Sequence, residues 1–171
     1  MDKTYAEILH ARTGNSVLAW TSVAPDILAA ANVLKERVDS FDLGSVAAGD
    51  SVPREALLGH VVLMLRGMAV ECLLKGLCLK RGNELVVDGK YSRVPGASDH
   101  NLCELASAVD FNVDYAEEAV LRRLSLFVQY GGRYPIPKSA VIYGQAATTW
   151  ATPSDENVFN ELVRRLDRSL E

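Results

Sequence analysis

The residues best suited to chemistry in this sequence fall in three short stretches that lie far apart along the chain. Glu71 and Lys75 are four positions apart inside a long apolar segment, so they share one face if that segment is helical. His100, one of only three histidines, begins the stretch "HNLCEL". The third stretch, "GGRYPIP", holds Arg133 and Tyr134 between two glycines and two prolines. We take these side chains as the main candidates for binding or catalysis.

Each of these stretches fits a structural and a functional interpretation. Glu71 and Lys75 form either an ordinary ion pair on an exposed edge of the helix, or a polar notch in a buried helix that holds a ligand. His100 either caps the next helix or lies at the surface, or its ring faces a cavity. Tyr134 and Arg133 either anchor a loop, with the arginine paired to a carboxylate such as Glu71, or hold a guanidinium ready for a phosphate. The prolines stiffen this loop in both cases.

Sequence motifs that hold metals or nucleotides are missing from this chain. It contains no HExxH motif, no EF-hand loop and no cluster of histidines and cysteines. It also contains neither a GxGxxG motif nor a phosphate-binding loop that ends in Gly-Lys-Ser/Thr. We therefore expect neither a metal ion nor a cofactor. Cys72, Cys78 and Cys103 lie in apolar helical contexts without CxxC spacing, which is typical of buried free thiols in a cytoplasmic protein.

Length and composition indicate a single domain over residues 1–171, of which residues 1–14 are polar and expected to be loosely held. Apolar residues make up 49% and charged residues 23%, an ordinary balance for a globular protein. The formal charge of −4 provides no global positive field to attract nucleic acid, although a local basic patch is compatible with it. We find no apolar run that approaches a membrane span and no apolar core of a signal peptide. We therefore expect a cytoplasmic protein without a membrane partner.

The spacing of apolar residues predicts an all-α fold. Apolar positions recur at helical steps in five segments, at residues 16–40, 53–81, 98–111, 113–130 and from 152 to beyond 166. Pro25 restarts or kinks the first segment, because proline fits the first turn of a helix and breaks its middle. Asp88-Gly89 suits the turn of a short hairpin, and a plain loop fits this stretch equally well. The prediction is a compact antiparallel bundle of about five helices, with a loop of about 20 residues before the last helix.

The segment 53–81 is expected to be the central helix of the bundle. It is apolar over most of its circumference, so neighbouring helices should contact it on several sides. The main stripe predicted to face the core consists of Leu57, Val61, Met64, Leu65, Met68, Cys72 and Leu79, and it is widened by Val62, Leu73 and Leu77. On this interpretation Met68 is a core residue, and a carboxylate at its position should unfold the protein.

Taken together, the three stretches resemble the HEPN family (higher eukaryotes and prokaryotes nucleotide-binding domain). The resemblance is to the branch with an E-x-x-L-K helix, an H-[DN]-L motif and a G-R-Y-P loop. The matching residues are Glu71, Leu74 and Lys75 for the first motif, His100, Asn101 and Leu102 for the second, and Gly132, Arg133, Tyr134 and Pro135 for the third. The order and spacing of the motifs carry the resemblance, which extends over about residues 55–137, roughly half of the chain.

The resemblance implies a compact helical bundle, often a homodimer, that acts in a bacterial stress or antiphage defence system. The leading interpretation is a non-catalytic module that binds a nucleotide, RNA or a protein encoded in the same operon. In it, His100, Asn101, Arg133 and Tyr134 gather near the polar pair of the central helix.

Two further interpretations stay open. Nuclease members of the family carry an Arg-x4–6-His motif, in which the arginine steadies the scissile phosphate and the histidine moves protons while the 2′-hydroxyl attacks. Arg93 precedes His100 with six residues between them, so the resemblance implies a metal-independent endoribonuclease that uses these two side chains. The third interpretation is a purely structural or adaptor bundle whose surface binds a partner protein.

Overall fold

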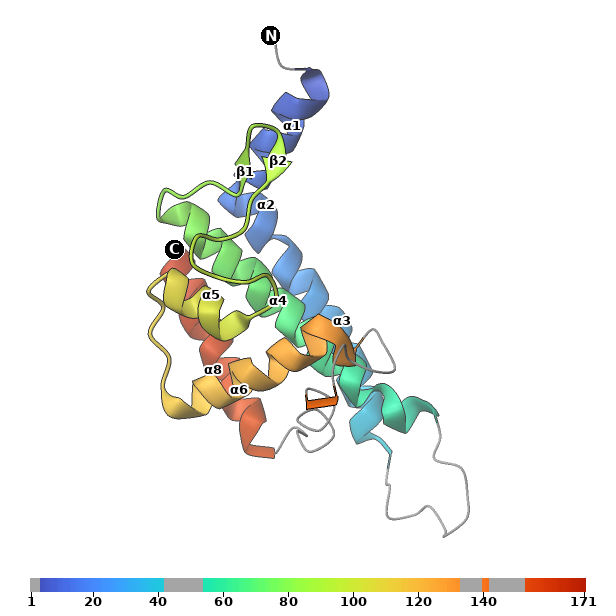
Figure 1. The fold of residues 1–171 in the computed structure, drawn as a ribbon. Coiled ribbons are helices and arrows are strands. Elements are labelled where there is room, and N and C mark those ends of the chain that lie inside the picture. Colours follow the sequence, from blue (N-terminus) through green and yellow to red (C-terminus); the bar gives the residue numbers. More distant parts are fainter. Residues whose placement is uncertain (1–3, 42–53, 133–139, 142–152) are drawn as a thin grey trace.

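The computed structural model of the chain describes residues 4–41, 54–132, 140–141 and 153–171 (Figure 1). In chain order, the helices and strands of this part of the chain are α1 (Tyr5–Gly14), α2 (Val17–Thr21), α3 (Val23–Asp39), η2 (Arg54–Leu58), α4 (Gly59–Lys80), β1 (Val86–Val87), β2 (Lys90–Tyr91), α5 (Leu102–Ala108), α6 (Tyr115–Leu126), η3 (Phe127–Gly131) and α8 (Pro153–Leu170). Apart from one short hairpin, the regular elements in these ranges are helices. The predicted all-α fold class is therefore confirmed.

Helix α4 crosses the middle of the molecule. Helices α2, α3, α5, α6 and α8 all contact it, and α3 runs antiparallel to it over most of its length (Figure 1). The helix ends where the sequence predicts, because Arg81 caps it and Gly82 follows with a φ of 83°, a left-handed conformation that glycine adopts at little cost. The central place predicted for this segment is confirmed.

The face that α4 turns to the core differs from the predicted stripe. Met68 is 38% exposed, so the expectation that it lies in the core is wrong. Of the predicted core-facing residues, Val62, Leu73, Leu77 and Leu79 are buried. The buried face also includes Leu63, Arg66, Gly67, Ala69, Val70 and Leu74, which the prediction left out. Because α4 is apolar on nearly every side, its sequence periodicity does not select one face. The inward face is selected by the close approach of η3, because an added Cβ at Gly67 would lie 2.2 Å from Cγ2 of Val128 in that element.

The N-terminal segment, expected to be loosely held, forms helix α1, which projects from the body beside the β1–β2 hairpin (Figure 1). Thr4 and Glu7 form a capping box at its start, and the helix buries no residue. Asn15 ties its end to the hairpin: its side-chain oxygen accepts from the backbone N–H groups of Leu85 and Val86, and its amide donates to the Val86 carbonyl. The hairpin is therefore held by a side chain as well as by its own two-strand ladder.

The structure contains the hairpin, one of the two alternatives left open for residues around Asp88-Gly89, and the helix break expected near Pro25. Asp88 and Gly89 have φ values of 50° and 72°, the two left-handed residues that a type I′ turn requires. Ser22 separates α2 from α3, and Pro25 lies in the first turn of α3. The first predicted helix is therefore two helices.

Helix α6 begins with a capping box of Asp114 and Glu117 and continues into the π-helical turn η3. Gly132 follows this turn and lies against α4, since an added Cβ would lie 2.4 Å from Cβ of Met64. Any residue can adopt its φ of −88°, so the backbone conformation does not require glycine at this position. The close contact with Met64 does require it. The first two residues of "GGRYPIP" therefore close the helix against the centre of the bundle.

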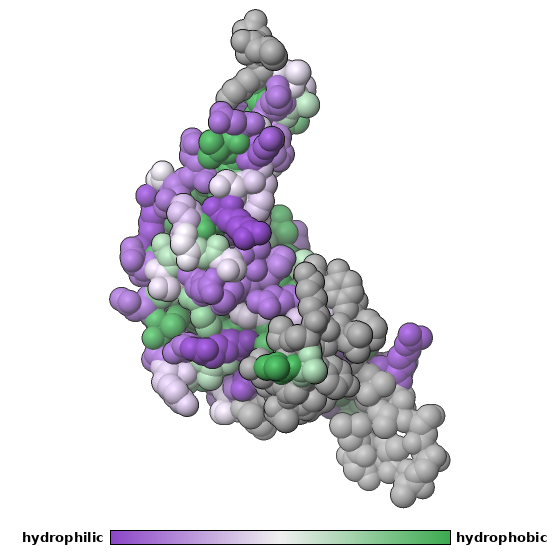
Figure 2. Space-filling view, viewed as in Figure 1, coloured by the Kyte–Doolittle hydropathy of each residue, from purple (hydrophilic) through white to green (hydrophobic). Residues whose placement is uncertain are grey.

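The surface carries scattered apolar side chains, and Figure 2 shows hydrophobic areas interrupted by hydrophilic ones on the projecting end of the molecule. Exposed large side chains on the N-terminal helices include Tyr5, Ile8, Leu9, Leu18, Val23 and Val33. The stretch Val17–Asp39 is also long and apolar enough, by length and composition alone, to cross a membrane, with 11% of its most apolar window buried. This stretch is an exception to the expectation that no apolar run reaches that length. Core helices and signal sequences pass the same test.

Candidate functional site

Glu71 and Lys75 form an ion pair inside the bundle. The Lys75 Nζ lies 2.7 Å from Oε1 of Glu71, and each residue is 6% exposed. The pair therefore does not lie on an exposed edge of α4. The ion pair of the first interpretation therefore forms, in the buried setting that the second interpretation assumed.

Two aromatic rings surround the Lys75 ammonium. Its Nζ lies 5.0 Å from the ring centre of Trp20 on α2 and 5.1 Å from that of Tyr91 on β2, both within the range of a cation–π contact. Burial disfavours the charged ammonium, but the hydrogen bonds and negative charge of Glu71, with a smaller contribution from Tyr91, outweigh it. They raise the pKa of Lys75 above its ordinary value. Lys75 is therefore a charged member of this cluster at neutral pH.

His100 completes the contacts of Glu71. Its Nδ1 lies 2.8 Å from Oε2 of Glu71, while 39% of its side chain is exposed. The backbone of His100 has a φ of 67°, an uncommon left-handed conformation for a residue with a side chain. Gln129 on η3 supports it by donating from Nε2 to the His100 carbonyl at 3.4 Å. The ring is held by one nitrogen, and its Nε2 has no hydrogen-bond partner among the described residues.

Asp99 links the hairpin to this histidine loop. Its Oδ1 accepts from the Tyr91 hydroxyl at 3.0 Å, and its Oδ2 lies 3.3 Å from Nε of Arg93. Burial raises the pKa of Tyr91, with an opposing effect of Lys75 and a further increase from Asp99. We call Glu71, Lys75, Tyr91, Asp99 and His100 the Glu71 cluster. Arg93 reaches the cluster through Asp99, with 71% of its side chain exposed, and within the described part of the chain no hydrogen bond or ion pair joins it to His100.

The remaining predicted site residues, Asn101, Arg133 and Tyr134, are not observed in the Glu71 cluster. Asn101 is the N-cap of α5, where its side-chain oxygen accepts from the Glu104 N–H at 3.3 Å, so the cap lies after His100 and not at it. Arg133 and Tyr134 lie outside the described residues. Both carboxylate oxygens of Glu71 have partners within the described part of the chain, namely Lys75 and His100.

The arrangement of His100 and Glu71 allows proton transfer or hydrogen bonding to a ligand. A buried carboxylate at Nδ1 favours the tautomer in which Nδ1 carries the proton, and it orients the ring. Nε2 then accepts a hydrogen bond, or donates one to an anion once the ring is protonated. The sequence placed these two residues in the same site, and the structure joins them directly.

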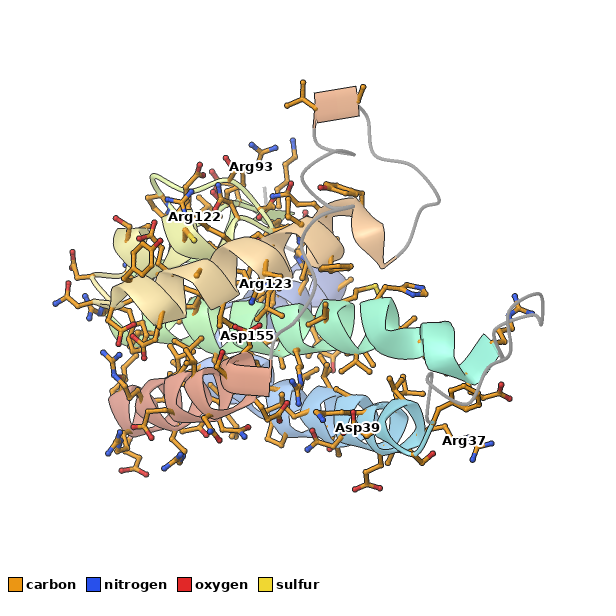
Figure 3. All side chains as sticks on the ribbon, turned by 90° about the horizontal axis from the view of Figure 1, so that it is seen from below. Arg37, Asp39, Arg93, Arg122, Arg123 and Asp155 are labelled. Carbon is orange, nitrogen blue, oxygen red and sulfur yellow. The ribbon has the colours of Figure 1, made fainter. Side chains whose placement is uncertain are left out.

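The sequence analysis missed two ion pairs with the first turn of α8, one made by the buried Arg66 and one by the partly buried Arg123. Arg66 on α4 donates from both terminal nitrogens to Glu156, at 2.9 and 2.8 Å, and Arg123 on α6 lies 2.6 Å from Asp155 (Figure 3). The Arg66 hydrogen bond is the main reason why the pKa of Glu156 is lowered. The only sequence signal was the acidic pair in the first turn of α8, which favours the positive end of the helix dipole.

A cavity of about 30 Å³ lies between these two ion pairs. The Nε atoms of Arg66 and Arg123 are buried and have no hydrogen-bond partner within the described residues. A cavity of this size holds a single water, which could accept from these donors. Each of the two arginines is thus paired with one carboxylate, and Lys35 Nζ also lies 3.8 Å from Oε2 of Glu156.

Metal ligands and reactive thiols do not gather in the described part of the chain. No group of three or more histidine, cysteine, aspartate or glutamate side chains there could hold a metal ion. Cys78 is buried, whereas Cys72 and Cys103 are half-buried, and burial raises the pKa of all three thiols. The expectation of free thiols holds, with two of the three only partly covered.

Comparison with known proteins gives no relative: no family model, no curated protein and no solved structure matches the chain.

Proposed function

We propose that this chain is a HEPN-like helical module that binds a nucleotide or RNA at the Glu71 cluster without cleaving it. The observation that carries the proposal is the His100 ring, held at Nδ1 by the buried Glu71 and open at Nε2. A hydrogen-bonding group fixed on one side and half-exposed on the other is how a protein presents a contact to a ligand. The left-handed backbone of His100 supports the proposal, because strained residues concentrate at functional sites.

The charges of the cluster favour an anionic ligand at His100. Glu71 compensates Lys75, and Arg93 compensates Asp99, so these four residues bring no net charge. A phosphate at Nε2 would meet no net negative charge from these four side chains, and the contact requires the imidazolium form of His100, in which Nε2 donates. A phosphate oxygen at Nε2 would form a charge-assisted hydrogen bond there.

A metal-independent endoribonuclease is the second candidate function. It is favoured by the Glu71–His100 pair, because a carboxylate that orients a histidine is the arrangement that proton-transfer enzymes use. Arg93, adjacent through Asp99, would steady the scissile phosphate. In this case the histidine would accept the proton of the 2′-hydroxyl and return one to the leaving 5′-oxygen.

The wider proposal concerns assembly and setting. We propose a cytoplasmic homodimer that acts in a bacterial stress or antiphage defence system, with a protein from the same operon as a further partner. Exposed Tyr5, Leu18 and Val33 on the N-terminal helices offer apolar area for a helix-on-helix contact. A purely structural or adaptor role predicts the same surface without any ligand at His100.

Binding of labelled RNA and of mononucleotides tests the proposal. His100→Asn removes the imidazole and keeps a residue that tolerates the left-handed backbone. We expect it to weaken binding with little change in melting temperature, whereas the exposed His10→Asn should bind as the parent does. Equal binding by His100→Asn and the parent would rule out this site, and absence of binding by the parent would leave the adaptor role.

A cleavage assay separates the two candidate functions. The parent, Arg93→Ala and His100→Asn are incubated with labelled RNA in EDTA, and the ends of any products are determined. Binding without cleavage supports the non-catalytic module. Cleavage that resists EDTA, leaves 2′,3′-cyclic phosphate ends and is lost in both variants would establish the endoribonuclease instead.

A further inference from the structure

Helix α3 has an outer face that is exposed from one end of the helix to the other. The helix packs on α4, with Ala24 and Ala31 fully buried. The opposite side carries a row of exposed residues whose spacing alternates between three and four positions: Val23, Asp26, Ala30, Val33, Arg37 and Ser40. This alternation keeps successive residues on one side of a helix, and it is the spacing of helices that pair along a seam. We call these six residues the α3 seam.

The middle of the α3 seam is small and apolar. Ala30 and Val33 lie there, and Val33 is 66% exposed. Short side chains let a second helix approach closely, so that the side chains of the two helices interdigitate. The surrounding stretch Val17–Asp39 is apolar, yet 11% of its most apolar window is buried within the described part of the chain. An exposed apolar face of this extent marks a contact with another molecule.

The two ends of the α3 seam carry opposite charges. Asp26 lies in the first turn of α3 and Arg37 in the last turn. Both side chains are exposed, and within the described residues neither makes a hydrogen bond or an ion pair. Figure 3 shows the Arg37 side chain directed away from the bundle. Glu36 lies about 100° around the helix from Arg37, outside the seam. The seam therefore changes from negative, through apolar, to positive along the helix.

This pattern matches a second copy of itself in the antiparallel direction. The midpoint between Asp26 and Arg37 along the helix coincides with the midpoint between Ala30 and Val33. A two-fold axis at that point places Asp26 opposite Arg37 of the second copy, and symmetry forms this pair twice. The same axis places Ala30 opposite Val33 of the second copy. A parallel pair would instead place like charges opposite each other at both ends.

We infer that two copies of this chain associate through the α3 seam, with their α3 helices antiparallel and Asp26 of each copy paired with Arg37 of the other. The inference rests on the proposed homodimer and adds its surface and its register. It does not depend on a ligand at His100. One pair of helices forms a small interface, so we expect a dimer that dissociates in the micromolar range.

A membrane surface fits this face less well than a second copy. Helix α3 carries two basic residues against three acidic ones, which are Lys35 and Arg37 against Asp26, Glu36 and Asp39. Anionic lipid headgroups attract lysine and arginine, so this balance gives the helix no net attraction to them. Neutral lipid would leave the opposite charges at the two ends of the seam without partners. An antiparallel copy of the chain supplies a partner for each.

Sedimentation equilibrium of the full chain, from micromolar to submillimolar concentrations, measures the dissociation constant. Val33→Glu places a carboxylate in the middle of the seam, close to the same carboxylate of the second copy. We expect it to weaken the dimer by about tenfold or more, with the helix content unchanged by circular dichroism. Tyr115→Glu is the control, because Tyr115 is 89% exposed but lies on α6, across α4 from α3 (Figure 3). It should associate as the parent does.

An exchange of charges tests the register. Asp26→Lys sets a lysine opposite Arg37, and Arg37→Glu sets a glutamate opposite Asp26, so each variant alone should associate about tenfold more weakly than the parent. In an equimolar mixture of the two variants, a mixed dimer again has opposite charges at both ends, and we expect association to recover. Each native charge also suits the dipole of its own helix end. Recovery in the mixture separates pairing from this effect, because mixing alters neither chain.

The outcomes separate this inference from the rest of the proposed function. Recovery in the mixture, together with a weakened Val33→Glu dimer, supports the inference. If the parent is a dimer but Val33→Glu associates equally well, or the mixture does not recover, the α3 seam is overturned and the proposed homodimer stands. If the parent stays monomeric, both are refuted, and its flotation with vesicles of phosphatidylcholine and phosphatidylglycerol would assign the face to lipid. RNA binding at His100 stands or fails separately in each case.

Discussion

Replacing Glu71 by alanine should destabilise the protein strongly, because it removes the partner of a buried ammonium. The side chains of Lys75 and Glu71 are 8% and 7% exposed, so solvent screens their interaction little. Breaking a buried ion pair from one side costs about 3–5 kcal/mol. Lys75 keeps the rings of Trp20 and Tyr91, so we expect the lower end, about 3 kcal/mol. Loss of the contact between Glu71 and His100 should add little to this destabilisation, because the His100 side chain is half-exposed and solvent weakens the interaction.

Urea and thermal unfolding measure this loss. With an m-value of about 2–3 kcal/mol per M, the urea midpoint should fall by about 1–1.5 M. For a domain of this size the melting temperature should fall by about 6–12 °C. Glu118→Ala is the control, because it removes a glutamate from an exposed i,i+4 pair with Arg122 and should cost less than about 1 kcal/mol.

The double variant Glu71→Leu/Lys75→Met distinguishes two causes of the lost stability, an unpaired Lys75 charge and the lost packing of the Glu71 side chain. It removes both charges and fills similar volume, so it should recover much of the stability lost in Glu71→Ala. A loss below about 1 kcal/mol in Glu71→Ala would refute the view that Lys75 is buried and depends on this carboxylate. A double variant as unstable as the single one would show that packing, and not charge, sets the loss.

Three other perturbations have defined outcomes. Gly67→Ala should lower the free energy of unfolding by about 1–3 kcal/mol in a denaturant titration, because its Cβ would overlap Val128; an unchanged value would contradict the close packing of α4 and η3. Asn15→Ala should cost about 1–3 kcal/mol and speed amide exchange in the β1–β2 hairpin, since three hydrogen bonds to its backbone are lost. The lowered pKa of Glu156 means that its ion pair with Arg66 stabilises the fold above about pH 4.5 and is lost as the pH falls through the folded-state value. Unfolding titrations should therefore show Glu156→Gln less stable than the parent at pH 7, with a difference that shrinks below pH 4.5.

Much of the secondary structure could be predicted from the sequence because its signals are local. Gly82 ends α4 and Asp88-Gly89 turns the hairpin, as their left-handed φ values require. The helix caps were less predictable. Asn101 is the N-cap of α5 and Asp114 is the N-cap of α6. In each case a residue two positions earlier, Asp99 or Asn112, is also of a type that caps helices.

The inward face of α4 could not be predicted, because it depends on residues distant in sequence. Met68 lies in an apolar pattern that fits a core position, but Gly67 faces the neighbouring helix and lets it approach closely. Arg66 turns inward because Glu156, ninety positions away, neutralises it there. A helix that is apolar on nearly every side leaves this choice to its neighbours.

The sequence also predicts some features of the candidate site and leaves others to the tertiary structure. The sequence by itself determined that Glu71 and Lys75 share one helical face, because four positions make about one turn. Only the tertiary structure decided that this face is buried and that His100, twenty-nine positions from Glu71, completes it. That contact requires the hairpin, the left-handed backbone of His100 and the packing of η3 behind it, and local propensity specifies none of these together. Residue types and spacing therefore supplied the chemical groups, and long-range packing joined them into one cluster.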